Sequence, residues 1–255
     1  MTNGVASPVG CTDIQTFVRN RYFYGKLLDV EQFDMEQTYV TKKRWLLNRL
    51  VTGYGVICGL NVGLSEDCKQ LWVGPGIALD KAGREIVVPV RSQPIAIPER
   101  PPETERKTDD DDDCNVASVS ICYHECPGDP EPVRANDCDE PSLCATGSIR
   151  ERYQVHIWPR KAPKIDAFCE VPDLLVGGRL NYAALANYVT ADCPEEYDDP
   201  CIALANITLP KSGETICEAD IDISIRPIVY TNDLLFELML GLTSQTQNRP
   251  RGGKS

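Results

Sequence analysis

Residues 19–33 read RNRYFYGKLLDVEQF and lead directly into a long helical pattern. Asp29 is a favourable N-cap residue, and Gln32 three positions later completes a capping-box pattern. From Val30 to Val51 the chain contains no Gly or Pro, and apolar residues recur at the seven-residue spacing of one helix face. These signals predict one long helix over residues 29–52.

Aromatic and basic residues crowd the entry to this helix. Arg21 precedes Tyr22, Phe23 and Tyr24, and Trp45 lies further along the helix. One interpretation is that the aromatic residues pack the helix entry within the chain. The other is a binding hot spot, because aromatic residues flanked by arginine are favoured at the centre of protein interfaces.

After Gly53 the sequence changes to short runs of β-branched residues separated by Gly and Pro, which is typical of strands. The segment 80–83, Asp-Lys-Ala-Gly, separates two apolar runs and predicts a hairpin turn. Prolines in 94–98 predict an edge strand, since proline cannot donate to a strand ladder, and the apolar run 201–209 predicts an interior strand. Strands and helices do not alternate regularly, so we expect an α+β fold with a mainly antiparallel sheet.

A second helical pattern begins at Thr231 or Asn232 and continues to about Leu242. Its apolar residues, which include Leu235 and Phe236, leave almost no polar side. A helix that is apolar nearly all round must be buried on most faces. We therefore expect it to pack either on the β layer of its own chain or in a neighbouring subunit.

These patterns divide the chain into consecutive segments. They are an N-terminal arm (1–28), the long helix (29–52), a mainly β domain (53–230) with a Cys-rich insertion (99–148), a C-terminal helix (231–243) and a flexible tail (244–255). We expect the arm and the tail to become ordered on assembly with other chains.

The chain has 255 residues and a formal net charge of -12, with a pI near 4.7. This charge disfavours nucleic acid as a partner, because most of the surface would repel phosphate. No apolar run reaches the roughly 18 residues of a membrane span. The first residues lack a basic start and an apolar run, so we expect synthesis in the cytoplasm without a signal peptide.

The 12 cysteines allow three interpretations: inert buried thiols, disulfides formed after release from the cell, or a metal site. Cys122, His124 and Cys126 are the best metal candidates, since they place three possible ligands within a short segment. In an extended strand Cys122 and Cys126 would lie about 13 Å apart, at ~3.3 Å per residue, which is too far for one zinc ion. The site therefore requires the chain to turn directly after Cys126, with Cys138 and Cys144 closing it.

The sequence contains no recognisable set of catalytic residues. The 2 histidines are His124 and His156, and the sequence contains no nucleophile elbow, phosphate-binding loop or dinucleotide-binding glycine pattern. The acidic run 109–113 lacks the spaced oxygens and the glycine of a calcium loop, so we expect a solvated loop there. We expect no catalytic residue, no cofactor and no metal, and therefore not an enzyme.

Several short motifs, the clearest of them near the N-terminus, resemble those of one group of proteins. They are RYFYGKLL at 21–28, Glu-Gln at 36–37, LLNRL at 46–50 and GYGVICGL at 53–60, with weaker continuations at 75–80, 83–88, 148–153, 200–205 and 229–240. In these motifs the chain resembles proteins of phage tails and phage-tail-like contractile injection systems. The resemblance implies a structural component of such a particle, associated with its baseplate or fibres, and implies no active-site residues.

We therefore predict a non-enzymatic structural component of a phage-tail-like contractile injection particle that is released from the cell or acts outside it. Its expected partners are other subunits of a large assembly, with further copies of itself among the candidates. The residues expected at the contacts are Arg21, Tyr22, Phe23, Tyr24, Phe33, Trp45, Leu235 and Phe236. The alternative is a cysteine-rich metal- or glycan-binding module at a secreted surface, and an enzyme with a carboxylate pair ranks last.

Overall fold

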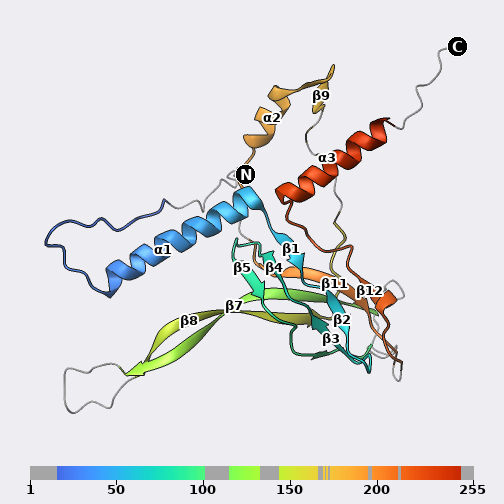
Figure 1. Ribbon diagram of the computed structural model, residues 1–255, viewed down its shortest axis with the longest axis horizontal. Helices are drawn as coiled ribbons and strands as arrows, with labels where there is room; N and C mark the ends of the chain where they lie inside the picture. The colour runs from blue at the N-terminus through green and yellow to red at the C-terminus, as the bar shows by residue number, and fades with distance from the viewer. Residues whose placement is uncertain are drawn as a thin grey trace, which may run out of the picture.

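The computed structural model describes residues 16–100, 115–132, 144–165, 169, 171, 173–194, 197–211 and 214–247. The helices lie on one side of a body of antiparallel sheets (Figure 1), which confirms the predicted α+β class. Across these ranges, no helix combines the length and the apolar character that a membrane span requires.

The long helix α1 spans Val30–Leu47 and begins as the sequence predicts. The Asp29 carboxylate accepts a hydrogen bond from the Gln32 backbone N–H at 3.3 Å, and the Gln32 side chain accepts one from the Asp29 N–H at 3.0 Å. A π-helical turn, Asn48–Thr52, follows α1 directly. The predicted helix over 29–52 is thus present, with its last turn widened.

The body contains three groups of paired strands. One sheet has the order β1-β4-β5, with β1 Gly55–Gly59, β4 Gly76–Leu79 and β5 Glu85–Val88. Another has the order β2-β3-β6, with β2 Val62–Leu64, β3 Gln70–Val73 and β6 Ile95–Ala96. A four-stranded sheet has the order β12-β11-β7-β8, with β7 Val116–Pro132, β8 Cys144–Trp158, β11 Ile202–Thr208 and β12 Ile221–Asp222. A small hairpin, β9 Leu175–Val176 and β10 Arg179–Leu180, precedes helix α2, Tyr182–Val189.

Three local predictions are confirmed by the strand pairing. The Asp80 N–H donates to the Arg84 carbonyl at 2.9 Å, which closes the hairpin turn between β4 and β5. Strand β6 lies at the edge of its sheet, within the proline-flanked segment. Strand β11 lies between β12 and β7, as expected for the apolar run 201–209.

The hydrophobic core lies between the four-stranded sheet and the two smaller sheets. Ile86 of β5 and Val73 of β3 pack in one buried cluster with Ile121 of β7, and Leu71 of β3 packs in a second with Val119 of β7. Each of these side chains is fully buried, which stabilises the fold by about 1.5–3 kcal/mol per side chain. Alternate residues of β7 therefore point into the core, and the residues between them point to the opposite face of the sheet.

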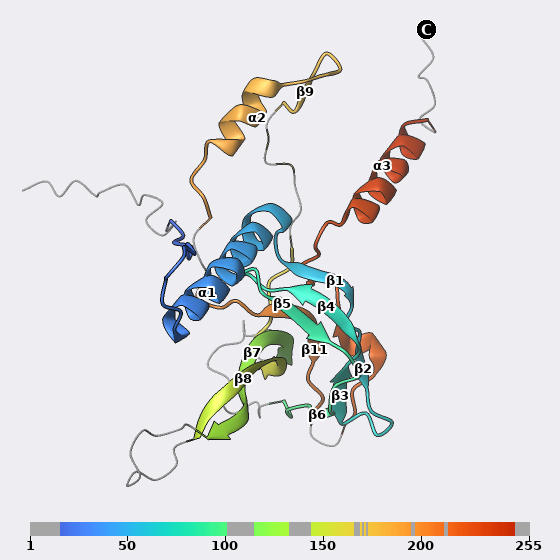
Figure 2. The same ribbon diagram turned by 60° about the vertical axis from the view of Figure 1, so that its left-hand side comes forward.

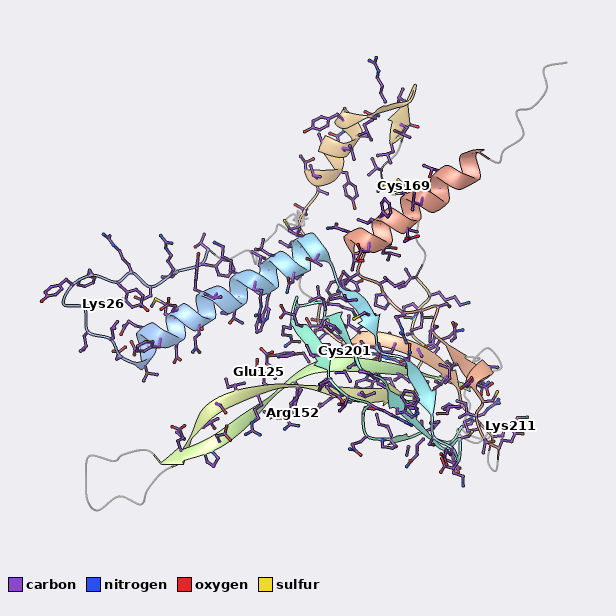
Figure 3. All side chains as sticks on the ribbon, in the orientation of Figure 1. Lys26, Glu125, Arg152, Cys169, Cys201 and Lys211 are labelled. Atoms are coloured by element: carbon purple, nitrogen blue, oxygen red, sulfur yellow. A yellow bond between two sulfur atoms is a disulfide. The ribbon has the colours of Figure 1, made fainter. Side chains whose placement is uncertain are left out.

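Strands β7 and β8 extend far into the predicted Cys-rich insertion (99–148). Their pairing runs from Ser118↔Trp158 to Pro132↔Cys144, and Arg150 forms an ion pair with Asp129 at 2.6 Å near the far end. Figure 3 shows Glu125 and Arg152 on the half of the hairpin that projects from the body. The prolines and cysteines of this segment suggested an insertion between two strands, but its described part is mostly strand.

The C-terminal helix α3 spans Asn232–Gln247 and therefore continues past the predicted end at 243. No proline occurs in this stretch before Pro250, so no residue forces the helix to end at 243. Both ribbon views show α3 leaving the β body instead of lying on a sheet (Figures 1 and 2).

Candidate subunit interface

The segment before α1 folds back along that helix (Figure 1). The Phe17 and Tyr39 rings meet edge to face with centroids 6.4 Å apart, and the Tyr22 hydroxyl donates a hydrogen bond to the Glu36 carboxylate. That hydrogen bond raises the pKa of Tyr22 above its ordinary value. Tyr22 is therefore partly engaged in packing the helix entry, which is the first of the two interpretations of the aromatic cluster.

The other aromatic residues of the cluster point to solvent. Phe23 is 64% exposed and Tyr24 is fully exposed, while Phe33 on the first turns of α1 is 52% exposed. Arg21 is also exposed. Because large aromatic side chains are exposed together, this stretch has the composition of an interface anchor, and its role in binding stays a prediction.

Trp45 has a contact inside the chain. Its ring meets the Tyr123 ring of β7 edge to face, with centroids 6.4 Å apart, and the Arg84 guanidinium lies 4.8 Å from the Tyr123 centroid. Trp45 is half-buried there. Its contact with Tyr123 therefore joins helix α1 to the β body.

The C-terminal end of α1 is fastened to the turn between β4 and β5. The Asn48 side-chain amide donates to the Gly83 carbonyl at 2.9 Å and to the Glu85 carboxylate at 3.0 Å. Arg44 pairs with Glu85 at 3.1 Å. Gly83 has a φ of 87°, and a Cβ there would lie 2.0 Å from the Trp45 carbonyl oxygen, so the helix backbone rests directly on a glycine.

Helix α3 exposes several large apolar side chains close together. The Thr231 hydroxyl caps it by accepting from the Leu234 N–H at 3.2 Å. Leu235 is 43% exposed and Phe236 is 56% exposed, and the large apolar residues that follow them on α3 are exposed as well. The first of the two expected environments, the chain's own β layer, does not cover these side chains in the described part of the chain.

The candidate metal ligands do not converge. Cys122 forms a disulfide with Cys201 of the neighbouring strand segment, with Cα atoms 4.5 Å apart. Strand β7 continues straight through His124 and Cys126, so the turn that a metal site requires is missing. In the described ranges, no group of three or more His, Cys, Asp or Glu side chains could hold a metal ion. Cys138 and the acidic run 109–113 lie outside those ranges.

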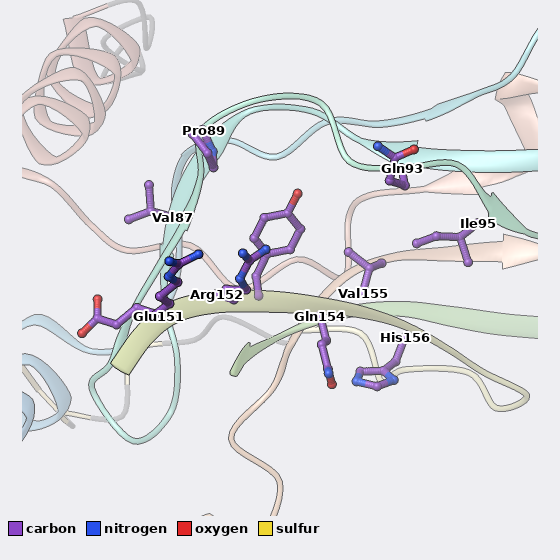
Figure 4. A pocket seen from close by; sticks show the side chains of 11 residues that line it. Val87, Pro89, Gln93, Ile95, Glu151, Arg152, Gln154, Val155 and His156 are labelled. Carbon is purple, nitrogen blue, oxygen red and sulfur yellow. The ribbon is translucent and has the colours of Figure 1, made fainter. Parts of the chain in front are cut away.

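A groove of about 930 Å³ lies beside β8 (Figure 4). Val87, Pro89 and Ile95 line one side, and the consecutive β8 residues 150–156 line the other. Strand β8 is the edge strand of its sheet. A strand edge beside an apolar wall is a place where another extended chain can pair, so the groove adds to the surfaces that suit a protein partner.

No family model matches the sequence, and no curated protein sequence matches it. A solved structure described as the crystal structure of TssK is similar over 93% of this chain and 51% of that chain, with a TM-score of 0.43 and 10% sequence identity. The chain thus spans about half the length of that structure, and a likeness at this level assigns no function.

Proposed function

We propose that this chain is a non-enzymatic structural subunit of a phage-tail-like contractile injection particle, associated with its baseplate or fibres, and that it acts through contacts with other subunits. The observation that carries the proposal is the apolar surface of α3, which no described part of the chain covers. The exposed aromatic residues before α1 and the motifs at 21–60 point in the same direction.

The distribution of side chains on α3 supports burial between partners. Asp233, Glu237 and Gly241 are spaced by four residues and therefore form one narrow line along the helix. At ~100° per residue, the apolar residues cover about 240°, or two thirds of the whole circumference. A helix that packs on a single surface needs an apolar stripe of only about 100°. The geometry of α3 therefore fits insertion between partner elements on two sides.

The same distribution favours a protein partner over a membrane surface. Helices that lie on membranes usually carry Lys and Arg on their polar face, because lipid headgroups are often anionic. The polar line of α3 carries Asp233 and Glu237 instead. Subunits of an assembly are thus the better match to its chemistry.

The experiment is a charge substitution on α3 with a matched control. Leu235→Asp combined with Phe236→Asp should abolish co-purification with the particle, since both side chains would carry a charge into the contact. Asp233→Asn combined with Glu237→Gln changes the same number of residues on the polar line and should leave incorporation unchanged. Circular dichroism melts of the isolated chains check that both variants fold.

The proposal fails if particles incorporate the Leu235/Phe236 variant as well as the unchanged chain. It fails also if the unchanged chain sediments as a monomer at all concentrations and never co-purifies with a particle. The metal site of the alternative, a metal- or glycan-binding module, gains no support from the described residues, since no group of three or more of their acidic, His and Cys side chains could hold a metal ion.

A further inference from the structure

A hollow of about 380 Å³ lies on the outer face of the four-stranded sheet, away from the hydrophobic core. Its floor includes Ser118 and Ser120 of β7 and Ala203 of β11. Ser120 is paired directly with Ala203, so three small side chains meet at this point of the sheet. The volume falls within the range of about 300–1,000 Å³ that is usual for small-ligand sites.

The wall of the hollow is held in place by the protein itself. The Asn206 side chain accepts from the Ala162 N–H and donates to the Ala162 carbonyl, both at 2.9 Å, and so fixes the segment that follows β8 across the sheet. The Lys81 ammonium donates to the Asp199 carbonyl at 3.1 Å, and Arg160 pairs with the Asp199 carboxylate at 3.7 Å. The site is therefore formed before any ligand arrives.

The two serine hydroxyls on the floor have spare hydrogen-bonding capacity. Ser118 is 3% exposed and Ser120 is 7% exposed, and both line the hollow. Neither hydroxyl makes a hydrogen bond with any residue that the structure describes, so both are available to a group that enters the hollow. Their residues point away from the core face of β7, toward the hollow, where a ligand or water can accept from them.

The rim of the hollow is positively charged. Lys81, Arg160 and Lys161 line the hollow together with one acidic residue, Asp199, in a chain whose net charge is -12. Aromatic rings position two of these cations: Lys81 lies 6.0 Å from the Tyr54 centroid, and Arg160 lies 5.7 Å from the Trp158 centroid. Both rings also line the hollow and offer it a flat apolar wall.

We propose that this hollow binds an oxyanion, a carboxylate or a phosphate, whose oxygens accept from Ser118 and Ser120 while the rim cations neutralise its charge. Hydrogen bonds to charged groups are about twice as strong as neutral ones, so two aligned hydroxyls suit an anion better than an uncharged ligand. The anion could come from a free phosphate compound or from an acidic side chain of a protein. This inference does not depend on the proposed function.

The test is calorimetric titration of the isolated chain with two probes, inorganic phosphate and the blocked dipeptide acetyl-Asp-Asp-amide. The Ser118→Ala/Ser120→Ala double variant keeps the shape of the floor and removes both hydroxyls, and it should weaken binding by at least roughly tenfold. Lys161→Gln should also weaken binding. Lys164→Gln, which removes an exposed charge outside the hollow, should not.

Each possible result either supports the proposed oxyanion site or overturns it. Saturable binding of phosphate that is lost in the serine variant supports the site and indicates a phosphate ligand. Binding of the dipeptide alone supports the site and indicates a protein carboxylate. Failure of both probes to bind, or equal binding by the serine variant with an unchanged unfolding curve, overturns the inference.

Discussion

Replacing Gly83 by alanine tests whether the long helix is held to the sheets by one close backbone contact. Gly83 lies in the turn between β4 and β5 with a φ of 87°. A Cβ at this position would lie 2.0 Å from the Trp45 carbonyl oxygen and 3.0 Å from the Arg49 backbone nitrogen. Both contacts are with helix backbone, so no side chain can rotate away to relieve them.

The expected cost has two parts. A left-handed backbone conformation costs a residue with a Cβ about 1–2 kcal/mol. Overpacking against backbone costs typically a further ~1–3 kcal/mol, because the helix end must move. Together the substitution should lower the free energy of unfolding by about 2–5 kcal/mol, a large share of the roughly 5–15 kcal/mol typical of a folded domain.

Gly25 provides the matched control. Its φ is 84°, almost the same as that of Gly83, but nothing lies within 4 Å of a Cβ built there. Gly25→Ala should therefore show at most the backbone penalty of about 1–2 kcal/mol. Urea unfolding followed by tryptophan fluorescence compares the two variants, and Trp45 reports directly on the contact. If the two free energies of unfolding agree within about 0.5 kcal/mol, the close contact does not hold the helix and the reasoning is wrong.

Three further predictions concern the disulfide, the Tyr123 hydroxyl, and the aromatic residues Phe23 and Trp45. Reducing the disulfide between β7 and the start of β11, which closes a loop with a sequence separation of 79, should lower the free energy of unfolding by ~4 kcal/mol. An unchanged urea midpoint with dithiothreitol would contradict this. Burial and the hydrogen bond to Glu125 raise the pKa of Tyr123 above 10.0, so its stabilising contribution is complete below about pH 10 and is lost as the pH rises through the folded pKa. Tyr123→Phe should therefore flatten the fall in urea midpoint above about pH 10, and equal slopes would count against it. Phe23→Asp should leave the unfolding curve unchanged but block incorporation into the particle, whereas Trp45→Asp should itself destabilise the fold by about 1–3 kcal/mol. Normal particles containing Phe23→Asp would remove that residue from the interface.

The features predicted well from the sequence are those set by neighbouring residues. The capping box at Asp29 and Gln32 spans four residues, and a hairpin turn at 80–83 needs only residues with the right backbone preferences. The nearly all apolar run 201–209 favours an interior strand, because an edge strand would leave several apolar side chains in water.

The features that were missed depend on residues far apart in the chain. Cys122 and Cys201 become neighbours only because β7 and β11 pair in one register, and no local spacing predicts that register. The serine pair on β7 gave a weak signal, since Ser118 and Ser120 alternate with core residues in an apolar strand. Alternation along β7 shows that both serines lie on the sheet face opposite the core. Only the distant contact between Asn206 and Ala162 shows that the segment after β8 crosses this face and forms one side of the hollow.

The exposed surface of α3 differs from ordinary apolar exposure in its continuity. More than half of a typical protein surface is apolar, so single exposed leucines need no explanation. On α3, Leu235, Phe236, Leu238, Met239, Leu240 and Leu242 are all exposed within two turns of one helix. A contiguous patch of this kind normally marks a binding surface. The β body encloses its core without α3, so selection for folding of the single chain does not explain why these positions are apolar, whereas burial in an assembly does.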